Sequence, residues 1–215
     1  MSEKITVHNL ENPEIALSMD RDAFYKEQVE VFKKTGKPSK ACQVADVFLF
    51  TEDKEIILQK RSSKKTHNAN LLDKSIGGHV TFGDTAFYTV IVETVQELKT
   101  PSIVLSTEED FQKTYLLLKN YLSTLAIIKQ IDEKILFIPK LINKEKIIIA
   151  NNVHLFFGIY SGAIKPVDKE ASGVLYYNLE TLREEMKSNP DFFTDDLKFF
   201  LHNYEKEINE FLKCF

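Results

Sequence analysis

The chain has 215 residues, of which 43% are hydrophobic and 28% charged, so it can form one large domain with a real core. Its 28 basic and 32 acidic residues give a formal net charge of −4, which argues against binding of a nucleic-acid polymer. The N-terminus lacks the apolar core of a signal peptide, and no apolar run approaches the ~18 residues that a membrane helix needs. The two cysteines form no disulfide or zinc pattern. Taken together, these features predict a cytoplasmic protein with no membrane partner.

Residues 1–39 predict an N-terminal extension with one helix. Residues 1–12 are compatible with a short strand. Asp20 is a typical N-cap residue for a helix that runs to about Lys34, and the stop signals Gly36 and Pro38 follow.

The next segment predicts a β-hairpin followed by a long loop. Apolar runs over residues 44–50 and 56–60 are separated by the polar stretch TEDK, which is typical of a hairpin. A basic cluster that includes Arg61 follows the second run, and solvated charge is the usual explanation of such a cluster. Residues 62–74 are mostly polar and show no regular period, so they predict a loop.

A glycine-rich segment then leads into a helix. Gly77, Gly78 and Gly83 are three of the seven glycines in the chain, and their concentration predicts a constrained loop. Asp84 or Thr85 is expected to cap the helix that follows, which ends at about residue 98.

The rest of the chain predicts interspersed helices and strands. Apolar residues three or four apart predict a helix over 107–131. Further strands are expected at 135–138, 147–150, 153–160 and 174–178, and further helices at 179–186 and 195–212. This alternation predicts an α/β sandwich around a mixed sheet.

Two carboxylates stand out on the helix over 85–98. Glu93 and Glu97 are four residues apart, with Gln96 beside them, so their side chains share one face. Such a pair can bind a hard cation such as Mg²⁺, which keeps several waters and therefore needs few protein ligands. Pairs of this kind are also common on solvated helix faces. The opposite, buried face of the helix is expected to comprise Phe87, Val90, Ile91, Val95 and Leu98.

The segment GGHVTFGDTAFYTVIVETVQELKT resembles the sequence motif of the Nudix family of diphosphate-cleaving hydrolases. Gly78 takes the place of the opening glycine of that motif, and Glu93 and Glu97 match two of its glutamates. The departures are Asp84 for the first glutamate, Val92 for the arginine, Thr94 for an aliphatic residue, Gln96 for a further glutamate and Lys99 for the closing glycine.

The flanking sequence extends this resemblance to roughly residues 40–201. VADVFLFTEDKEIILQKRSSKK is similar to the hairpin before the motif, and LLDKSIGGHVTFGD resembles the branch related to isopentenyl-diphosphate isomerase. The resemblance implies a Nudix-type α/β/α sandwich over residues 40–215. The helix over 107–131 would then be an insertion that pads the domain, lines the pocket or forms a homodimer interface.

The resemblance also implies a chemistry. In this family the motif glutamates hold Mg²⁺ or Mn²⁺, and water attacks a small-molecule diphosphate linked to another group, such as a nucleoside diphosphate derivative. Glu93 and Glu97 would be the carboxylate ligands, and Gln96 would offer an uncharged carbonyl oxygen. Glu170 lies where the family often places a loop acid, so it is a candidate general base, although an exposed loop glutamate is the commoner situation.

Four other residues take supporting roles by the same resemblance. Arg61 could contact phosphate, and His79 directly follows Gly78 and could face the substrate. Gly83 and Asp84 would shape the motif together with Gly78.

The departures from the motif leave a second function open. With Val92 and Gln96 in place of an arginine and a glutamate, the chain could be a catalytically weak or inactive Nudix-fold module that binds a nucleotide or diphosphate. Isomerase activity is disfavoured, because that enzyme needs a cysteine just before the motif, where this chain reads DKSIGGH.

Overall fold

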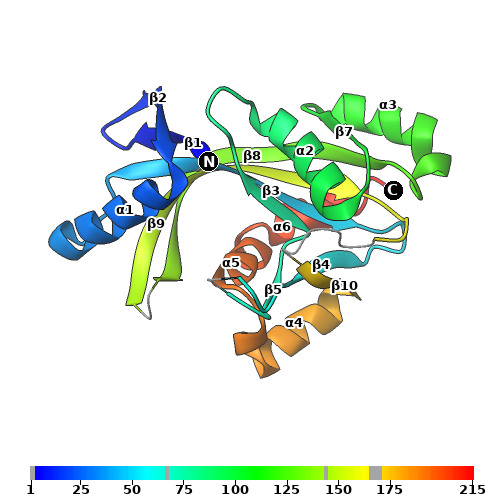
Figure 1. Cartoon of the computed structure of the whole chain (residues 1–215). Coiled ribbons are helices and arrows are strands. Elements are labelled where there is room, and N and C mark those ends of the chain that lie inside the picture. The colour runs from blue at the N-terminus through cyan, green and yellow to red at the C-terminus, as the bar shows by residue number, and fades with distance from the viewer. Residues whose placement is uncertain (1–2, 66–67, 143–144, 165–170) are drawn as a thin grey trace.

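The computed structural model describes residues 3–65, 68–142, 145–164 and 171–215. Ten strands form one sheet, whose main path runs β10-β4-β3-β9-β8-β7 (Figure 1). The strands β1, β2, β5 and β6 pair with members of this path or with each other. The sheet is mixed, because β3 pairs with β9 in parallel and with β4 and β6 in antiparallel orientation.

The N-terminal region contributes a hairpin and a helix. The strands β1 (Lys4–Asn9) and β2 (Asn12–Asp20) are antiparallel, and β1 also pairs with β3 (Lys40–Phe50). The helix α1 (Arg21–Thr35) begins where the Asp20 carboxylate accepts a hydrogen bond from the Ala23 amide, at 3.0 Å. It ends at Gly36, whose φ of 73° suits glycine. Both predicted helix boundaries are therefore confirmed.

The predicted hairpin is also confirmed, as β3 and β4 (Ile56–Arg61). Within the segment predicted as a loop, β5 (Leu72–Asp73) adds a short pairing with β4. The next strand, β6 (Ile76–His79), carries the glycine pair and lies antiparallel to β3.

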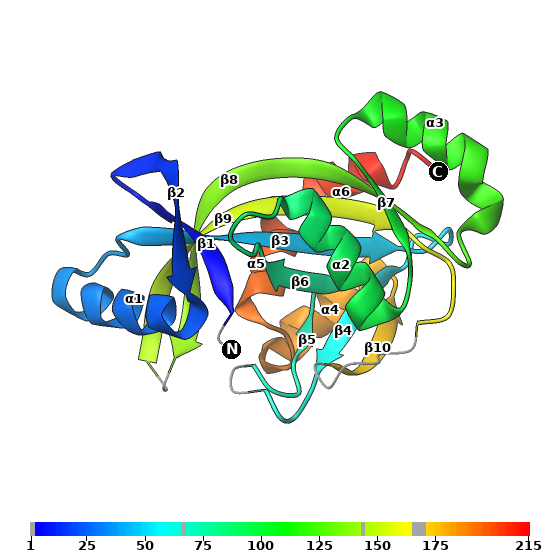
Figure 2. The same ribbon diagram turned by 45° about the horizontal axis from the view of Figure 1, so that its top comes forward.

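The helix α2 (Ala86–Leu98) begins at Thr85, whose hydroxyl accepts a hydrogen bond from the Tyr88 amide. Figure 2 shows α2 lying over β6 and β3. Its predicted buried face is partly wrong, because Ile91 and Val95 are 39% and 44% exposed. The helix instead turns Val90, Thr94, Glu97 and Leu98 towards the sheet, all of them buried. Glu97, which was predicted to lie apart from the buried face, therefore lies on the packed side of the helix.

The predicted helix over 107–131 is wrong in its second half. After β7 (Ser102–Leu105), α3 (Glu108–Leu118) and one 3₁₀ turn (Lys119–Tyr121) are followed by β8, which begins at Ala126. Residues 126–128 are consecutive and fully buried. This is expected for a strand whose two faces are both covered, whereas a helix would bury residues on one face only.

The two longest strands form a hairpin in the middle of the sheet. The strands β8 (Ala126–Ile142) and β9 (Glu145–Ile159) stay paired over their whole length, so the short strands predicted here belong to one continuous pair. Figure 1 shows that the far end of this hairpin curves away from the rest of the sheet, beside α1.

The C-terminal region closes the second face of the sheet. It contains β10 (Ala171–Tyr177), α4 (Leu179–Ser188), a 3₁₀ turn (Pro190–Phe192), α5 (Asp195–Asn203) and α6 (Glu205–Phe211). The single helix predicted over 195–212 is thus interrupted at Tyr204.

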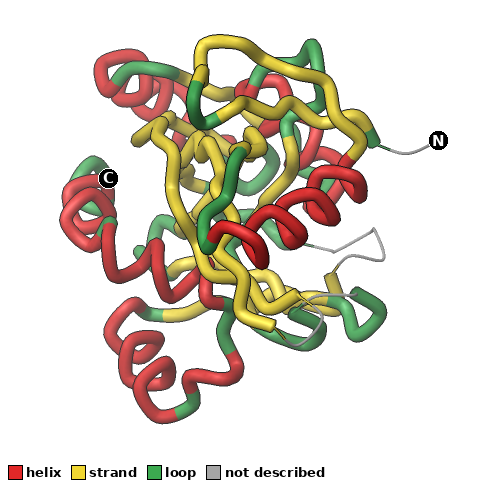
Figure 3. The backbone as a smooth tube through the Cα atoms, turned by 90° about the vertical axis from the view of Figure 1, so that its left-hand side faces the viewer, coloured by secondary structure: helices red, strands yellow, loops and turns green. Residues whose placement is uncertain are grey.

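Two hydrophobic clusters lie on opposite faces of the sheet. The larger cluster packs under α5 and α6, and the smaller one lies under α2. Figure 3 shows helices on both sides of the strands. The predicted α/β/α sandwich around a mixed sheet is therefore confirmed. In the part of the chain that the structure describes, no helix has the length and apolar character needed to span a bilayer.

Candidate functional site

A cavity of about 440 Å³ lies beside the helix α2 and the glycine strand β6. Its walls come from the helices α1, α2 and α5 and from the strands β3, β4, β6, β8 and β9. Of the residues predicted from sequence, it brings together Arg61, Gly78, His79, Glu93, Gln96 and Glu97. Segments that are far apart in the chain thus meet at one place, as expected for a ligand site.

Glu97 is the more enclosed of the two α2 carboxylates. It is 4% exposed, and its Oε2 accepts a hydrogen bond from Nε2 of Gln59, at 3.2 Å. Gln59 lies on β4 and is itself buried, so this contact ties the helix to the sheet below it. A buried carboxylate that is held in one orientation is suited to a fixed ligand or acceptor role.

Glu93 lies against the backbone of Gly78. A Cβ atom at Gly78 would overlap Oε1 of Glu93 and would stand 2.9 Å from its carboxyl carbon. Glycine at this point of β6 therefore lets the Glu93 carboxyl group lie against the strand. The helix and the glycine strand are therefore matched in shape at the cavity wall.

We expect Gly78→Ala to displace the Glu93 carboxylate from its place at the cavity wall and to lower, at least about tenfold, any turnover that depends on this carboxylate. Stability should change little, because the displaced atoms are the end of a flexible side chain. Gly173→Ala is a matched control, because a Cβ on that glycine would have open space around it. Turnover and thermal unfolding of both variants check this, and equal turnover in the two would contradict it.

The remaining motif residues have different surroundings. Gly83, with a φ of 96°, and the exposed Asp84 lie in the turn before α2, outside the described cavity lining. Gln96 is exposed and lies at the cavity mouth. Glu170 lies outside the described residues.

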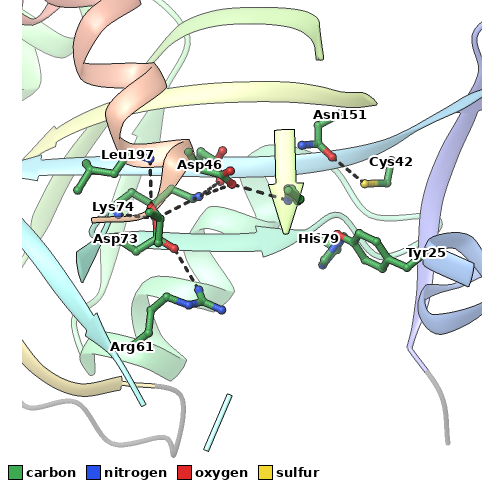
Figure 4. A network of polar contacts seen from close by, with 12 residues as sticks. Tyr25, Cys42, Asp46, Arg61, Asp73, Lys74, His79, Asn151 and Leu197 are labelled. Atoms are coloured by element: carbon green, nitrogen blue, oxygen red, sulfur yellow. Dashed lines mark hydrogen bonds and ion pairs between the residues drawn. The ribbon is translucent and has the colours of Figure 1, made fainter. Parts of the chain in front are cut away.

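Arg61 contacts a carboxylate that the sequence did not single out. Its Nη1 donates to Oδ2 of Asp73, at 3.0 Å (Figure 4). Asp73 in turn accepts a hydrogen bond from the Thr194 hydroxyl, at 2.9 Å. The Arg61 guanidinium, which was predicted to contact phosphate, is therefore already held in place at the cavity edge.

His79 forms a pair with Tyr25, a residue that sequence reasoning missed. A hydrogen bond of 2.9 Å joins Oη of Tyr25 to Nε2 of His79, and the two rings meet edge to face (Figure 4). Burial lowers the pKa of His79 to about 3 and raises that of Tyr25 to about 12. Both rings are therefore uncharged near neutral pH. Nothing in the local sequence around Tyr25 signals this contact, because α1 and β6 meet only in the folded chain.

A buried network of charges forms the floor of the cavity. Nζ of Lys74 lies 3.3 Å from Asp46, 3.7 Å from Asp73 and 3.7 Å from Asp196. Lys140 also lies 3.7 Å from Asp196. Burial alone would lower the pKa of Lys74, but the three carboxylates raise it above its ordinary value. Lys74 is therefore a permanent cation, enclosed by acids from three different elements.

The same network predicts a pH effect on stability. Burial raises the pKa of Asp46 to about 6 from 3.8, although Lys74 opposes the shift. The folded state therefore holds this proton more tightly than the unfolded state, and stability from this group is lost as the pH rises towards 6. We expect Asp46→Asn to become more stable relative to wild type by about 1 kcal/mol between pH 5 and 7.5. Urea unfolding at both pH values measures this, and a constant difference would contradict it.

The residues at α2 fit a hard divalent cation. Among the described residues there is no cluster of three or more histidine, cysteine, aspartate or glutamate side chains that could hold a metal. Mg²⁺ nevertheless needs only one or two carboxylates when waters or substrate oxygens complete its shell. Glu93 and Glu97 provide two such oxygen donors at one wall, and Gln96 adds an amide carbonyl at the cavity mouth.

Comparison with known proteins relates this architecture to solved structures. No family model and no curated protein matches the sequence. A protein of Deinococcus radiodurans, DR0079, is similar in structure with a TM-score of 0.60 and 14% identity, over 94% of this chain and 99% of that one. A MutT protein of Methanosarcina mazei has a TM-score of 0.51 and 15% identity, over 78% and 94% of the two chains.

A third structure was solved with ligands. It is a bifunctional NMN adenylyltransferase/ADP-ribose pyrophosphatase of Francisella tularensis, complexed with AMP and a manganese ion. The TM-score is 0.50 with 16% identity, and the match covers 87% of this chain and 47% of that one. At such identities the likeness is one of fold. With a mixed sheet between helical layers, and with a glycine strand and an acidic helix at one cavity, the chain has the Nudix fold.

Proposed function

We propose that the protein is a divalent-metal-dependent hydrolase of a diphosphate linked to another group, such as a nucleoside diphosphate derivative. One observation carries this proposal. Glu93 and Glu97 project from α2 into the same cavity, beside the backbone of Gly78, on a Nudix fold. The two carboxylates thus share one cavity, and their oxygens can bind a hard cation there.

The proposal assigns roles to several of the residues that line the cavity and, from the sequence alone, to Glu170. Glu93 and Glu97 hold Mg²⁺ or Mn²⁺, with the carbonyl of Gln96 as a neutral third donor. Such a cation, when bound, neutralises charge on the diphosphate and activates water.

Gln59 keeps Glu97 in its orientation through the 3.2 Å hydrogen bond. Arg61, fixed by Asp73, donates to a phosphate oxygen at the cavity edge. His79, uncharged, faces the substrate, and Glu170 is the candidate general base.

The ligand of one structural neighbour agrees with the class of substrate. The Francisella tularensis protein, of which this chain matches 47%, was solved with AMP and a manganese ion, and these ligands support a nucleotide-like substrate and a divalent metal in the proposal. A cavity of about 440 Å³ is also within the usual range for a small-molecule site.

A second candidate function is a module that binds a nucleotide or diphosphate with little catalysis. The observation that favours it is the character of the two substituted positions. Gln96 brings no charge to the cavity mouth, and Val92 cannot form the ion pair of an arginine. A metal site with fewer charges binds Mg²⁺ less tightly and stabilises a developing charge less.

The two functions are separated by a turnover assay. Purified protein is incubated with ADP-ribose, sugar nucleotides, dinucleoside polyphosphates and nucleoside triphosphates, in Mg²⁺ and separately in Mn²⁺, and phosphate or nucleotide release is measured. Turnover that requires the metal supports the hydrolase, and the active compound identifies the substrate class. Calorimetric binding of a panel compound without turnover would favour the binding module instead.

A further inference from the structure

The cavity extends beyond the motif residues to a second wall, formed by α1 and the far end of the β8–β9 hairpin. Tyr25, Lys140, Ile142 and Asn151 line this wall. Lys140 lies on β8 and lines the cavity. Figure 1 shows that this end of the hairpin curves away from the rest of the sheet. The far end of the hairpin and α1 thus add a region that the motif itself does not provide.

The ammonium of Lys140 is poorly satisfied by the protein. Its one ion-pair partner among the described residues is Asp196, whose Oδ2 lies 3.7 Å away, and no described residue accepts a hydrogen bond from Nζ. A charge-assisted hydrogen bond is usually about 2.7–2.9 Å long. Asp196 is also shared, because Lys74 lies at the same distance of 3.7 Å from it. Lys140 therefore has N–H donors available to the cavity.

Lys140 remains charged in this environment. Burial alone would lower its pKa, but the carboxylate of Asp196 raises it above its ordinary value. The Lys140 side chain as a whole is 25% exposed and lines the cavity, so it is partly shielded from water. A cation with unused donors in a partly desolvated cavity favours an anionic oxygen over a neutral one.

The neighbouring groups do not fill this role. Tyr25 and His79 are uncharged and bonded to each other. Arg21 lies at the cavity rim, where it pairs with Glu3 at 3.0 Å. Lys74 is enclosed by three carboxylates, whereas Lys140 has one. Lys140 differs from both of these cations, because its single carboxylate partner among the described residues lies at 3.7 Å, beyond ordinary hydrogen-bond distance.

We propose that Lys140 forms a second anion-binding subsite, which takes a phosphate or carboxylate group on the part of the substrate remote from the diphosphate. The proposal rests on the proposed function for the identity of the ligand as a substrate. It narrows the substrate class to diphosphate compounds whose other end carries an anionic oxygen group. The diphosphate would lie at α2, and the remote anion would lie at the hairpin wall.

The test uses free anions in the absence of any divalent metal. Inorganic phosphate and acetate are titrated separately into the full chain with EDTA present, and binding is followed by line broadening of the ³¹P or ¹³C signal. The variants are Lys140→Met, Lys140→Gln and Lys140→Arg. Lys146→Met is the matched control, because Lys146 is an exposed lysine of the same hairpin outside the described cavity lining.

We expect at least one of the two anions to bind, with affinity lowered about tenfold or more in Lys140→Met and Lys140→Gln. Lys140→Arg and Lys146→Met should bind as wild type does, and thermal unfolding identifies any variant that is not folded. If one neutral variant does not fold, the other decides. The anion that binds identifies the chemical group. Absence of binding by both anions, or equal binding by the folded neutral variants, would overturn the proposal.

A Glu97→Gln variant separates this inference from the proposed function. Metal-free anion binding at Lys140 should be the same in that variant as in wild type, whatever happens to turnover. If the chain hydrolyses no diphosphate but binds anions through Lys140, the hydrolase proposal fails and the subsite remains. If turnover is found without Lys140-dependent binding, the subsite fails and the hydrolase remains.

Discussion

Glu97→Gln is expected to lower kcat/KM about 10²–10³-fold, the size of effect seen when one group that stabilises transition-state charge is removed. Glutamine has nearly the same volume and retains an oxygen that can accept the hydrogen bond from Gln59. The folded structure should therefore persist while the negative charge offered to a metal is lost. Initial rates on the best compound of the panel, measured at saturating Mg²⁺ or Mn²⁺, give the ratio.

Glu109→Gln serves as the control for this variant. Glu109 lies on α3 with a side chain that is 77% exposed, and it pairs only with Lys113 among the described residues. Its turnover should equal that of wild type. If Glu97→Gln retained full activity while remaining folded, the carboxylate could not be a metal ligand, and the hydrolase mechanism proposed for this cavity would be wrong.

Lys74→Met should destabilise the protein by about 3–5 kcal/mol, the usual cost of removing one partner from a buried ionic network. The substitution keeps a long apolar side chain but leaves Asp46, Asp73 and Asp196 without their shared cation. Part of this loss should be recovered in the double variant Lys74→Met/Asp46→Asn, because the second change removes one uncompensated charge. Urea unfolding at pH 7.5 measures all three proteins.

Lys146→Met is again the appropriate comparison, because an exposed lysine contributes little to stability. It should stay within about 0.5 kcal/mol of wild type. A similar small effect in Lys74→Met would mean that the three carboxylates take up protons or rearrange without cost. The charge network would then not be a structural support of the cavity.

Local sequence signals predicted well those features that are decided within a few residues. The caps at Asp20, Gly36 and Thr85 depend on hydrogen bonds and backbone angles within one turn, and the structure has them at the expected places. The β3–β4 hairpin was likewise predictable, because two apolar runs flank a short polar turn.

Features that depend on distant neighbours were missed or misplaced. The segment from Ala126 alternates too little to reveal a strand by its period. It is buried on both faces because Ile127 packs into one hydrophobic cluster of the folded chain and Ala126 and Ile128 pack into the other. Ile91 and Val95 look like core residues on a helical wheel, but the sheet lies against the side that carries Thr94 and Glu97. Amphipathic spacing predicts that a helix is present more reliably than it predicts which side of the helix packs against the sheet.

The same distinction between local and long-range signals applies to the residues of the candidate site. The resemblance named Glu93, Gln96, Glu97, Gly78, His79 and Arg61, and these six line one cavity. It also named Gly83 and Asp84, which lie outside the described cavity lining, and Glu170, which lies outside the described residues. Tyr25, Lys74, Asp46 and Lys140 come from α1, the β5–β6 connection, β3 and β8, and they carry no motif. Their roles follow from contacts between segments, and only a folded chain reveals such contacts.

The parallel pairing of β3 with β9 also bears on how the chain is made. Ala41 lies beside Ala150, so the middle of the sheet closes only after most of the polypeptide has left the ribosome. Until then β3, which is buried over most of its length, lacks its parallel neighbour and offers an apolar edge. A nascent chain halted before Glu145 would therefore expose the unpaired apolar edge of β3, to which chaperones can bind. The charge network that forms the cavity floor would assemble only late in synthesis.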